Sequence, residues 1–291
     1  MKILITGHTG QVARELQRAL AQHELVSLGR ADFDLAQPQK LGEVILRERP
    51  TLVINAAAYT AVDQAEQERE LAFTINAEAP GAMADACFEL DIPLIHYSTD
   101  YVFDGSKATA YREADTPRPL GVYGASKAAG EQALRISGCE HLILRTSWVY
   151  SQHGRNFLLT MQRLLQEREQ LKVVDDQIGA PTWAGSIASA TAELIEKWQQ
   201  GRYHWGTYHL TCQGQTSWFG FASAIAERLR AQGKHCAELL PIPSSDYPTP
   251  ARRPLNSRLD GERLAQDWQV SLPHWEQALD ACLSEPQAIK R

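Results

Sequence analysis

The first 150 residues alternate short apolar runs with longer segments of helical periodicity. The runs are rich in β-branched residues and comprise Ile3–Ile5, Leu25–Leu28, Leu52–Ile54, Leu94–Tyr97 and Leu142–Leu144. Short apolar strands separated by helix-length segments predict βαβ units, whose parallel strands are covered by helices on both faces. Because crossovers between parallel strands are right-handed, the pattern predicts an α/β fold with a doubly wound, mostly parallel Rossmann sheet.

After Tyr150 the alternation becomes less regular. Residues 156–168 predict an amphipathic helix, 172–174 a strand and 186–198 another helix. We therefore predict an NAD(P)-binding Rossmann domain over residues 1–150 and a smaller, mainly substrate-binding part over 151–291, of which 172–211 returns to pack on the Rossmann domain. The proline-rich segment 240–254 should be largely extended, either as a structured loop over a site or as an ordinary surface crossover.

Composition narrows the class of protein and its partners. Lys and Arg number 29 against 35 Asp and Glu, a net charge of −6 without a basic tract, so nucleic acid is not an expected partner. No run approaches the roughly 20 apolar residues of a membrane helix. The apolar run at the N-terminus is too short for a secretory signal peptide. The five cysteines never show CxxC spacing. We expect a cytoplasmic protein without a membrane partner or a metal site.

A glycine turn follows the first predicted strand. Gly7 and Gly10 stand in GxxGxxA spacing before a segment of helical period, and Gln11 and Val12 open that segment. Glycine at such a turn permits positive φ and close approach of a pyrophosphate, which the free N–H groups of the helix N-terminus then bind. A tight turn that only packs helix on sheet would show the same pattern.

The end of the second strand bears on the choice of cofactor. NAD-dependent proteins commonly carry a carboxylate there, whereas this chain has Gly29 and Arg30. The planar guanidinium of Arg30 suits a 2′-phosphate, which favours NADPH over NADH. The alternative is a solvated surface arginine.

Tyr123 and Lys127 form a YxxxK pair in a segment that starts a predicted helix. Four residues apart, both side chains project from one helix face. An ammonium beside a phenol favours the phenolate and so lowers the tyrosine pKa, which suits proton transfer. The spacing also occurs by chance, but Thr99 and Asp100 follow another strand end, where open α/β sheets bind ligands. Thr99 can donate to a substrate oxygen, or merely cap a turn.

Together these motifs resemble the extended short-chain dehydrogenase/reductases. The resemblance runs nearly end to end and rests on the glycine turn, 55–63, 98–103, the YGxSK of 123–127, 145–150, 176–182 and 247–254. It implies reduction of the C4 ketone of dTDP-4-dehydro-β-L-rhamnose to dTDP-β-L-rhamnose, a nucleotide sugar. It also implies that Tyr123 gives its proton to the developing alkoxide, that Lys127 holds the nicotinamide ribose, and that Thr99 polarises the keto oxygen.

By the same resemblance, further positions would contact the two ligands. Those assigned to the cofactor are Gly10, Gln11, Val12, Asp34, Leu35, Ala57, Ala58, Tyr59 and Tyr97. Those assigned to the sugar nucleotide are Asp100 and Trp148, with Trp148 as a flat apolar wall. Core packing alone would also explain that tryptophan. Arg252 and Arg253 are candidates to meet the diphosphate, although one of them could only support its loop.

Departures from the family pattern limit what carries over. Some members form a dimer bridged by Mg²⁺; Glu15 matches one of the acidic positions, but Gly185 and Ser186 offer no carboxylate at the second. We therefore expect a monomer or a weak homodimer, and Mg²⁺ is doubtful. Two other functions stay open: an epimerase or dehydratase of nucleotide sugars, which also uses the Tyr and Lys pair, and a regulatory subunit that keeps the fold without the chemistry. The first is disfavoured because Tyr101, not Glu, follows Asp100, and the second because Tyr123 and Lys127 are both present.

Overall fold

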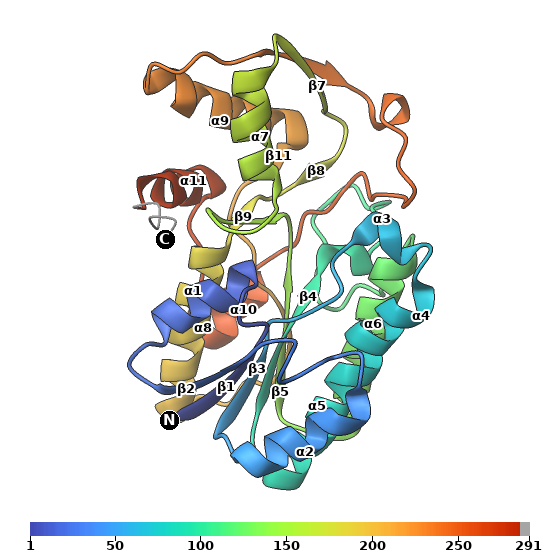
Figure 1. Cartoon of the computed structure of the whole chain (residues 1–291), viewed down its shortest axis with the longest axis vertical. Helices are drawn as coiled ribbons and strands as arrows, with labels where there is room; N and C mark the ends of the chain where they lie inside the picture. The colour runs from blue at the N-terminus through green and yellow to red at the C-terminus, as the bar shows by residue number, and fades with distance from the viewer. Residues whose placement is uncertain (286–291) are drawn as a thin grey trace.

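Within residues 1–285, which the computed structural model describes, six parallel strands form the central sheet in the order β10-β5-β4-β3-β1-β2 (Figure 1). They are β1 (Lys2–Thr6), β2 (Glu24–Leu28), β3 (Leu52–Asn55), β4 (Leu94–Thr99), β5 (His141–Thr146) and β10 (Gly206–His209). The first five contain the apolar runs that the sequence marks as strands. The predicted α/β fold with a doubly wound parallel sheet is confirmed.

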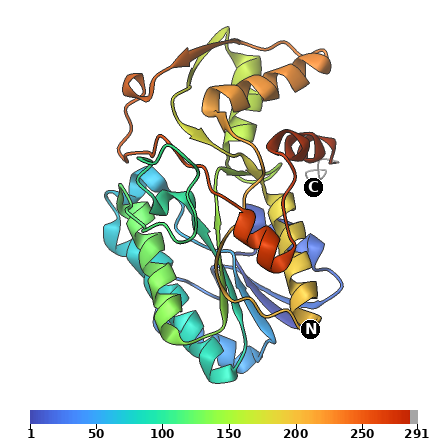
Figure 2. The same ribbon diagram turned by 180° about the vertical axis from the view of Figure 1, so that it is seen from behind.

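Helices cover both faces of this sheet (Figures 1 and 2). On one face α1 (Gln11–Ala19) packs against α8 (Ala184–Gln199); on the other α5 (Ala79–Leu90) lies between α2 (Pro38–Glu48) and α6 (Val122–Ser137). The pleat sends alternate strand residues to opposite cores. Ile3 and Ile5 join the α1 and α8 side, whereas Leu4 lies in the core beneath α2 and α5. Burial on both faces explains why the strands are continuously apolar.

The approach to α6 is made of short helical pieces. They are α3 (Val62–Ala65), α4 (Arg69–Phe73), a π-helical turn (Thr74–Glu78) and a 3₁₀ turn (Asp100–Val102). A methyl group at Gly124 would collide with the Tyr101 carbonyl oxygen, and one at Gly130 with the Asn76 carbonyl oxygen. The small residues of this helix therefore let its backbone lie directly against both turns.

The second part of the chain stands beyond the carboxyl ends of the strands (Figure 1). There β7 pairs in parallel with β12, β8 pairs with β11, β6 pairs with β9, and α7 packs against α9. The bounds are β6 (Val149–Tyr150), α7 (Phe157–Glu167), β7 (Gln170–Val174), β8 (Ile178–Gly179), β9 (Thr182–Trp183), β11 (Thr216–Ser217), α9 (Trp218–Ala231), β12 (Glu238–Ile242) and α11 (Trp275–Ser284). The remaining helix, α10 (Glu262–Trp268), packs against β10 of the central sheet. In residues 1–285 no helix is both long and apolar enough to cross a membrane.

Residues 172–211 divide between the two parts. α8 packs against α1 and β10 extends the sheet beside β5, whereas β7 pairs with β12 in the second part. The return to the Rossmann sheet therefore starts at α8, later than residue 172. The division into domains at residue 150 stays a prediction.

The proline-rich segment 240–254 is more regular than expected at its start. Its first three residues complete β12, because a proline is tolerated in an edge strand and Pro241 lies in such a strand. A 3₁₀ turn (Ser244–Asp246) follows, and Asp176 accepts hydrogen bonds from the Ser244 N–H at 2.9 Å and hydroxyl at 2.8 Å. At the far end, Arg253 forms a two-pronged ion pair with Asp63 at the start of α3. The segment is thus fixed at both ends.

Candidate active site

A cavity of about 580 Å³ opens at the carboxyl ends of the strands. It lies where the chain order reverses, since β1 is flanked by β2 on one side and β3 on the other. Open α/β sheets bind ligands at such a reversal. The predicted site residues in its lining are Gly7, Gly10, Gln11, Val12, Arg30, Asp34, Leu35, Ala57, Ala58, Tyr97, Tyr123 and Lys127. The structure therefore brings the glycine turn and the Tyr and Lys pair into one cavity.

The glycine turn has the geometry that a phosphate-binding turn requires. Gly7 has φ of +85°, and a methyl group there would press on Ala57 at 3.1 Å. Gly10 is the N-cap of α1 and supplies no side-chain cap, so the first N–H groups of the helix are open toward the cavity. Helix N-termini of this kind bind anions through their N–H groups and dipole. These residues fit the pyrophosphate of a dinucleotide.

Arg30 lies at the outer end of the same cavity. Its side chain is 81% exposed and approaches Asp34 only at 3.7 Å. Exposed ion pairs at such distances contribute little free energy, so the guanidinium can turn to another anion at low cost. Arg155, which no sequence pattern singled out, also lines the cavity.

Lys127 is buried and Tyr123 is partly buried at the cavity wall, and their surroundings shift the two pKa values in opposite directions. Burial raises the pKa of Tyr123 to about 12; a hydrogen bond with Thr99 acts against this rise, and the Asp100 carboxylate adds to it. Burial lowers the pKa of Lys127 to about 8, against the attraction of Glu131. We expected the Lys127 ammonium to lower the pKa of Tyr123; here Thr99 has that effect instead. Lys127 is directed at the Tyr97 carbonyl oxygen, at 2.6 Å, and at His96.

Thr99 and Asp100 connect the end of β4 to Tyr123. The Thr99 hydroxyl donates to Asp100 Oδ1 at 2.9 Å and accepts from the Tyr101 N–H at 3.2 Å, so this threonine also caps the 3₁₀ turn. Burial raises the pKa of Asp100 to about 6, although the hydroxyl groups of Ser257 and Thr99 oppose the shift. Asp100 Oδ2 is buried without a hydrogen-bond partner among residues 1–285. Such an atom suits a hydroxyl group of a ligand.

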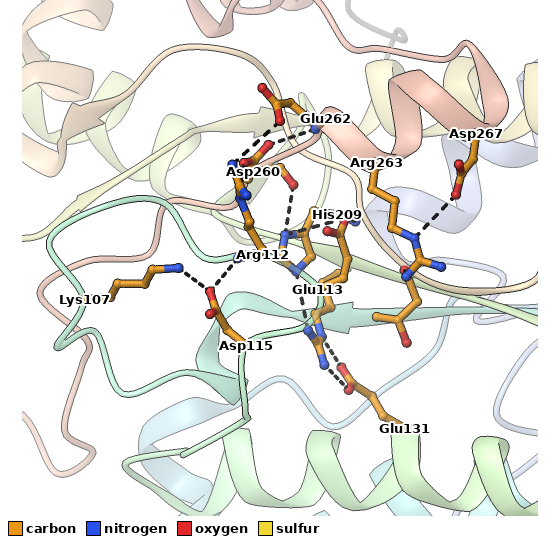
Figure 3. Close-up of polar contacts among 12 residues, drawn as sticks. Lys107, Arg112, Glu113, Asp115, Glu131, His209, Asp260, Glu262, Arg263 and Asp267 are labelled. Atoms are coloured by element: carbon orange, nitrogen blue, oxygen red, sulfur yellow. Dashed lines mark hydrogen bonds and ion pairs between the residues drawn. The ribbon is translucent and has the colours of Figure 1, made fainter.

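Glu131 was not predicted, although its place four residues after Lys127 puts it on the same face of α6. Its buried carboxylate forms a two-pronged ion pair with Arg145 of β5, at 2.8 and 2.7 Å, and accepts from the Ser98 hydroxyl at 2.7 Å. Figure 3 shows this ion pair and the contacts that continue through His209 to Asp260. The network fixes α6, and with it Tyr123 and Lys127, to the sheet.

Trp148 lies after the end of β5, outside the cavity lining. Its backbone has φ of +46°, a strained conformation for a bulky residue. Its indole stacks on Trp218 with ring centroids 3.6 Å apart and planes at 8°, and a methyl group at Gly179 would collide with it. Strained residues concentrate at functional sites, so the strain is consistent with a ligand contact. No pattern in the sequence marked Trp218.

Of the remaining predicted residues, Tyr59, Arg252 and Arg253 lie outside the cavity lining. Tyr59 donates its hydroxyl to Glu68 at 2.8 Å. Tyr97 lines the cavity, but its hydroxyl lies 2.7 Å from Thr191 of α8. Arg253 is engaged by Asp63, whereas Arg252 is exposed. The two arginines therefore have different surroundings.

Glu15, the position that matches a metal ligand in some relatives, faces Arg18. Its buried carboxylate pairs with that guanidinium at 3.1 Å, and burial raises the pKa of Glu15. No group of three or more His, Cys, Asp or Glu in the part of the chain that the structure describes is placed to hold a metal ion. The doubt about Mg²⁺ stays a prediction.

Comparison with known proteins assigns the family. The family model described as "RmlD substrate binding domain" matches residues 1–288. A dTDP-4-dehydrorhamnose reductase of Burkholderia thailandensis is 46% identical over 98% of this chain and 99% of that protein. The chain belongs to the dTDP-4-dehydrorhamnose reductase family. An Escherichia coli K12 protein of the same name is 44% identical, with 98% of each chain covered.

A solved structure gives the same assignment. The dTDP-4-dehydrorhamnose reductase of Bacillus anthracis, in complex with NADP, superposes with a TM-score of 0.89 at 34% identity, over 98% of this chain and 99% of that one. Membership of this reductase family therefore agrees with the cavity, in which a dinucleotide-type glycine turn and a Tyr and Lys pair meet.

Proposed function

We propose that this protein reduces the C4 ketone of dTDP-4-dehydro-β-L-rhamnose to dTDP-β-L-rhamnose, with NADPH preferred over NADH as the reductant. The observation that carries the proposal is the cavity that joins the glycine turn of β1 to Tyr123 and Lys127 of α6. The names of relatives 44 to 46% identical over nearly their whole length support the substrate, and the NADP complex of a relative supports the cofactor.

Tyr123 would act as the proton donor of this reduction. When bound, the reduced nicotinamide supplies the hydride that C4 of the sugar receives. The ketone oxygen then becomes an alkoxide, which is more basic than a phenolate and takes the Tyr123 proton. A pKa of about 12 keeps the Tyr123 hydroxyl protonated and ready to donate. The Thr99 hydroxyl would turn from Asp100 to the same oxygen and stabilise its developing charge.

Other groups would hold the sugar nucleotide. Asp100 Oδ2, buried without a partner in residues 1–285, would accept a hydrogen bond from a sugar hydroxyl. The indole of Trp148, held by Trp218 and Gly179, would supply an apolar wall for the deoxysugar. Arg252 would meet the diphosphate, because Arg253 is engaged in fixing the loop to Asp63.

The direct test is consumption of NADPH with the keto sugar made in situ by the preceding enzyme. We expect NADPH to be oxidised in a one-to-one ratio with the sugar, and the product to be dTDP-β-L-rhamnose. An epimerase or dehydratase would convert the sugar while recycling its cofactor, and a regulatory subunit would bind without turnover. Absence of NADPH oxidation by the folded protein would overturn the proposal.

Arg30→Asp tests the preference for NADPH. We expect the ratio of kcat/KM for NADPH to that for NADH to fall by about ten- to a hundredfold, because a hydrogen bond to a charged group contributes about 1.5–3 kcal/mol and the new carboxylate repels the 2′-phosphate. Steady-state kinetics with both cofactors measures the ratio. Arg47→Asp, at an exposed position on α2, is the control for the added charge. An unchanged ratio in Arg30→Asp would show that Arg30 is only a surface residue.

A further inference from the structure

Three polar residues form one rung of the otherwise apolar sheet. Thr6 of β1 is the register partner of Asn55 of β3, and Asn55 is the register partner of His96 of β4. Each is at most 1% exposed. The residues two positions earlier in these strands lie in the core beneath α2 and α5, and are Leu4, Val53 and Leu94. Because side chains alternate along a strand, the rung faces the same side, toward α6.

Hydrogen bonds connect these three residues to one another and then to Lys127. The Thr6 hydroxyl donates to Asn55 Oδ1 at 2.7 Å, and Asn55 Nδ2 lies 3.0 Å from His96 Nδ1. On the other edge of the imidazole, His96 Nε2 lies 3.2 Å from Lys127 Nζ. A continuous buried chain of hydrogen bonds thus runs across three neighbouring strands to the amino group of Lys127.

A backbone N–H determines which atoms donate and which accept in this series of hydrogen bonds. The Ala57 N–H points to Asn55 Oδ1 at 3.3 Å and to the Thr6 hydroxyl oxygen at 3.2 Å. A backbone N–H is always a donor, so it favours the Asn55 amide with its oxygen on this side and its NH₂ toward His96. His96 Nδ1 then accepts. A neutral imidazole carries one N–H, so the proton resides on Nε2.

The Nε2–H consequently faces Lys127 Nζ. An ammonium has three N–H groups and no lone pair, whereas an uncharged amine can accept from Nε2–H. Burial, with Lys127 next to it, holds the pKa of His96 far below its ordinary value, so the ring stays neutral. Among the other ionisable groups, Glu131 on the same helix acts on Lys127 and is itself paired with Arg145 of β5, whereas His141 of β5 acts on His96. Of these, Glu131 is the one whose charge raises the pKa of Lys127.

We propose that His96 is a positioning residue that acts through Lys127: Thr6 and Asn55 hold its imidazole in the Nε2–H tautomer, which favours the uncharged form of the Lys127 amine. The Tyr97 carbonyl oxygen and His96 use two of the three hydrogen-bonding positions of Lys127 Nζ. The third position is left for a group in the cavity. His96 would therefore help to set the pH at which Lys127 loses its charge. This inference rests on the proposed function only for the role of Lys127 in turnover.

The tautomer can be measured without turnover. ¹⁵N NMR of the histidine ring nitrogens distinguishes a protonated nitrogen from an unprotonated one, and loss of the signal in His96→Leu assigns it. We expect Nε2 of His96 to be protonated and Nδ1 not, on both sides of neutral pH. A proton on Nδ1, or on both nitrogens, would overturn the inference whether or not the protein reduces the sugar. The expected tautomer in a protein that fails to oxidise NADPH would instead count against the proposed function alone.

The kinetic consequence is a shift of the pH profile. His96→Leu removes the N–H that disfavours the ammonium, so the pKa of Lys127 should rise and the alkaline limb of kcat should move to higher pH by about half a unit or more, about a threefold change in proton affinity. Thr6→Val, which loosens the Asn55 amide without touching Lys127, should give a smaller shift in the same direction. A purely structural role would lower kcat without moving the limb.

The control is Thr182→Val, which removes another buried strand hydroxyl, one that donates to the Ala180 carbonyl oxygen and has no contact with the hydrogen bonds that lead to Lys127. Its pH profile should match that of the unchanged protein. Thermal melting identifies variants that fail to fold, and if His96→Leu is one of them, Thr6→Val decides. An alkaline limb that stays in place, or moves to lower pH, in a folded variant would refute the role of His96.

Discussion

Replacing Tyr123 with phenylalanine should lower kcat by about 10²–10⁴-fold, the range in which a positioned general acid contributes. The substitution removes a hydroxyl that forms a hydrogen bond with Thr99 in the cavity that Lys127 also lines, so the developing alkoxide would lose its proton donor. The phenyl ring keeps the packing against Tyr101, whose ring centroid lies 5.6 Å away. Rapid-mixing measurement of NADPH oxidation would separate this loss from product release.

Cofactor affinity separates a chemical role from a binding role. NADPH should bind Tyr123→Phe nearly as well as the unchanged protein, because the glycine turn and Arg30 are untouched. Tyr208→Phe is the matched control: it also deletes a buried phenolic hydroxyl, which donates to Asp267 at 2.9 Å, but it lies outside the cavity. That variant should lose about 1 kcal/mol of the free energy of unfolding and keep its kcat. Unchanged turnover in Tyr123→Phe would refute the assignment of Tyr123 as the proton donor.

The sequence predicts the fold and one end of the site well, because both depend on local patterns. Each buried parallel strand is a continuous apolar run, and the ends of β1 and β4 are marked by residues that do not suit a strand interior, such as Gly7 and Asp100. Because the carboxyl ends of parallel strands meet at one edge, these local marks also place the cavity. The spacing of Tyr123 and Lys127 needs only helix geometry.

Features that depend on contacts between distant segments were not predictable in this way. In the sequence, His96 is one residue of a predicted apolar strand. Only the register of β1, β3 and β4 shows that it lies beside Asn55, which in turn lies beside Thr6. Trp218 gains its importance from stacking on Trp148, 70 positions earlier in the sequence. Arg252 and Arg253 are likewise equivalent in the sequence, and only the fold shows that Arg253 pairs with Asp63.

The pKa values of Tyr123 and Lys127 also could not be predicted from the sequence. Spacing alone suggested that Lys127 would dominate the pKa of Tyr123, but burial has the largest effect on both groups. Desolvation depends on how completely the fold encloses a side chain, which no local pattern reports. The short helices and turns that pack against α6 supply that enclosure. Chemistry that is suggested by a motif is therefore tuned by residues far from it in sequence.

Asp100→Asn should raise the free energy of unfolding at neutral pH by about 3 kcal/mol and at the same time impair turnover. The pKa of Asp100 is about 6 in the folded protein against 3.8 as the ordinary value, so the carboxylate is a destabilising charge in its buried site. Between these two pKa values the folded state binds more protons than the unfolded state, and its stability falls as pH rises. Below about pH 4 both states are protonated and the cost disappears.

Denaturant unfolding at a series of pH values measures this effect. The unchanged protein should lose stability as pH rises through the window from about 4 to about 6, and Asp100→Asn should lack that contribution. Asp104→Asn is the control of opposite sign, because hydrogen bonds from Ser106 hold the pKa of Asp104 below its ordinary value. That variant should be less stable at neutral pH. If Asp100→Asn were both less stable and fully active, Asp100 would be a structural residue whose carboxylate is stabilised by the surrounding protein. Greater stability with a raised KM for the keto sugar would instead show a buried charge retained, at a cost in stability, for binding the substrate.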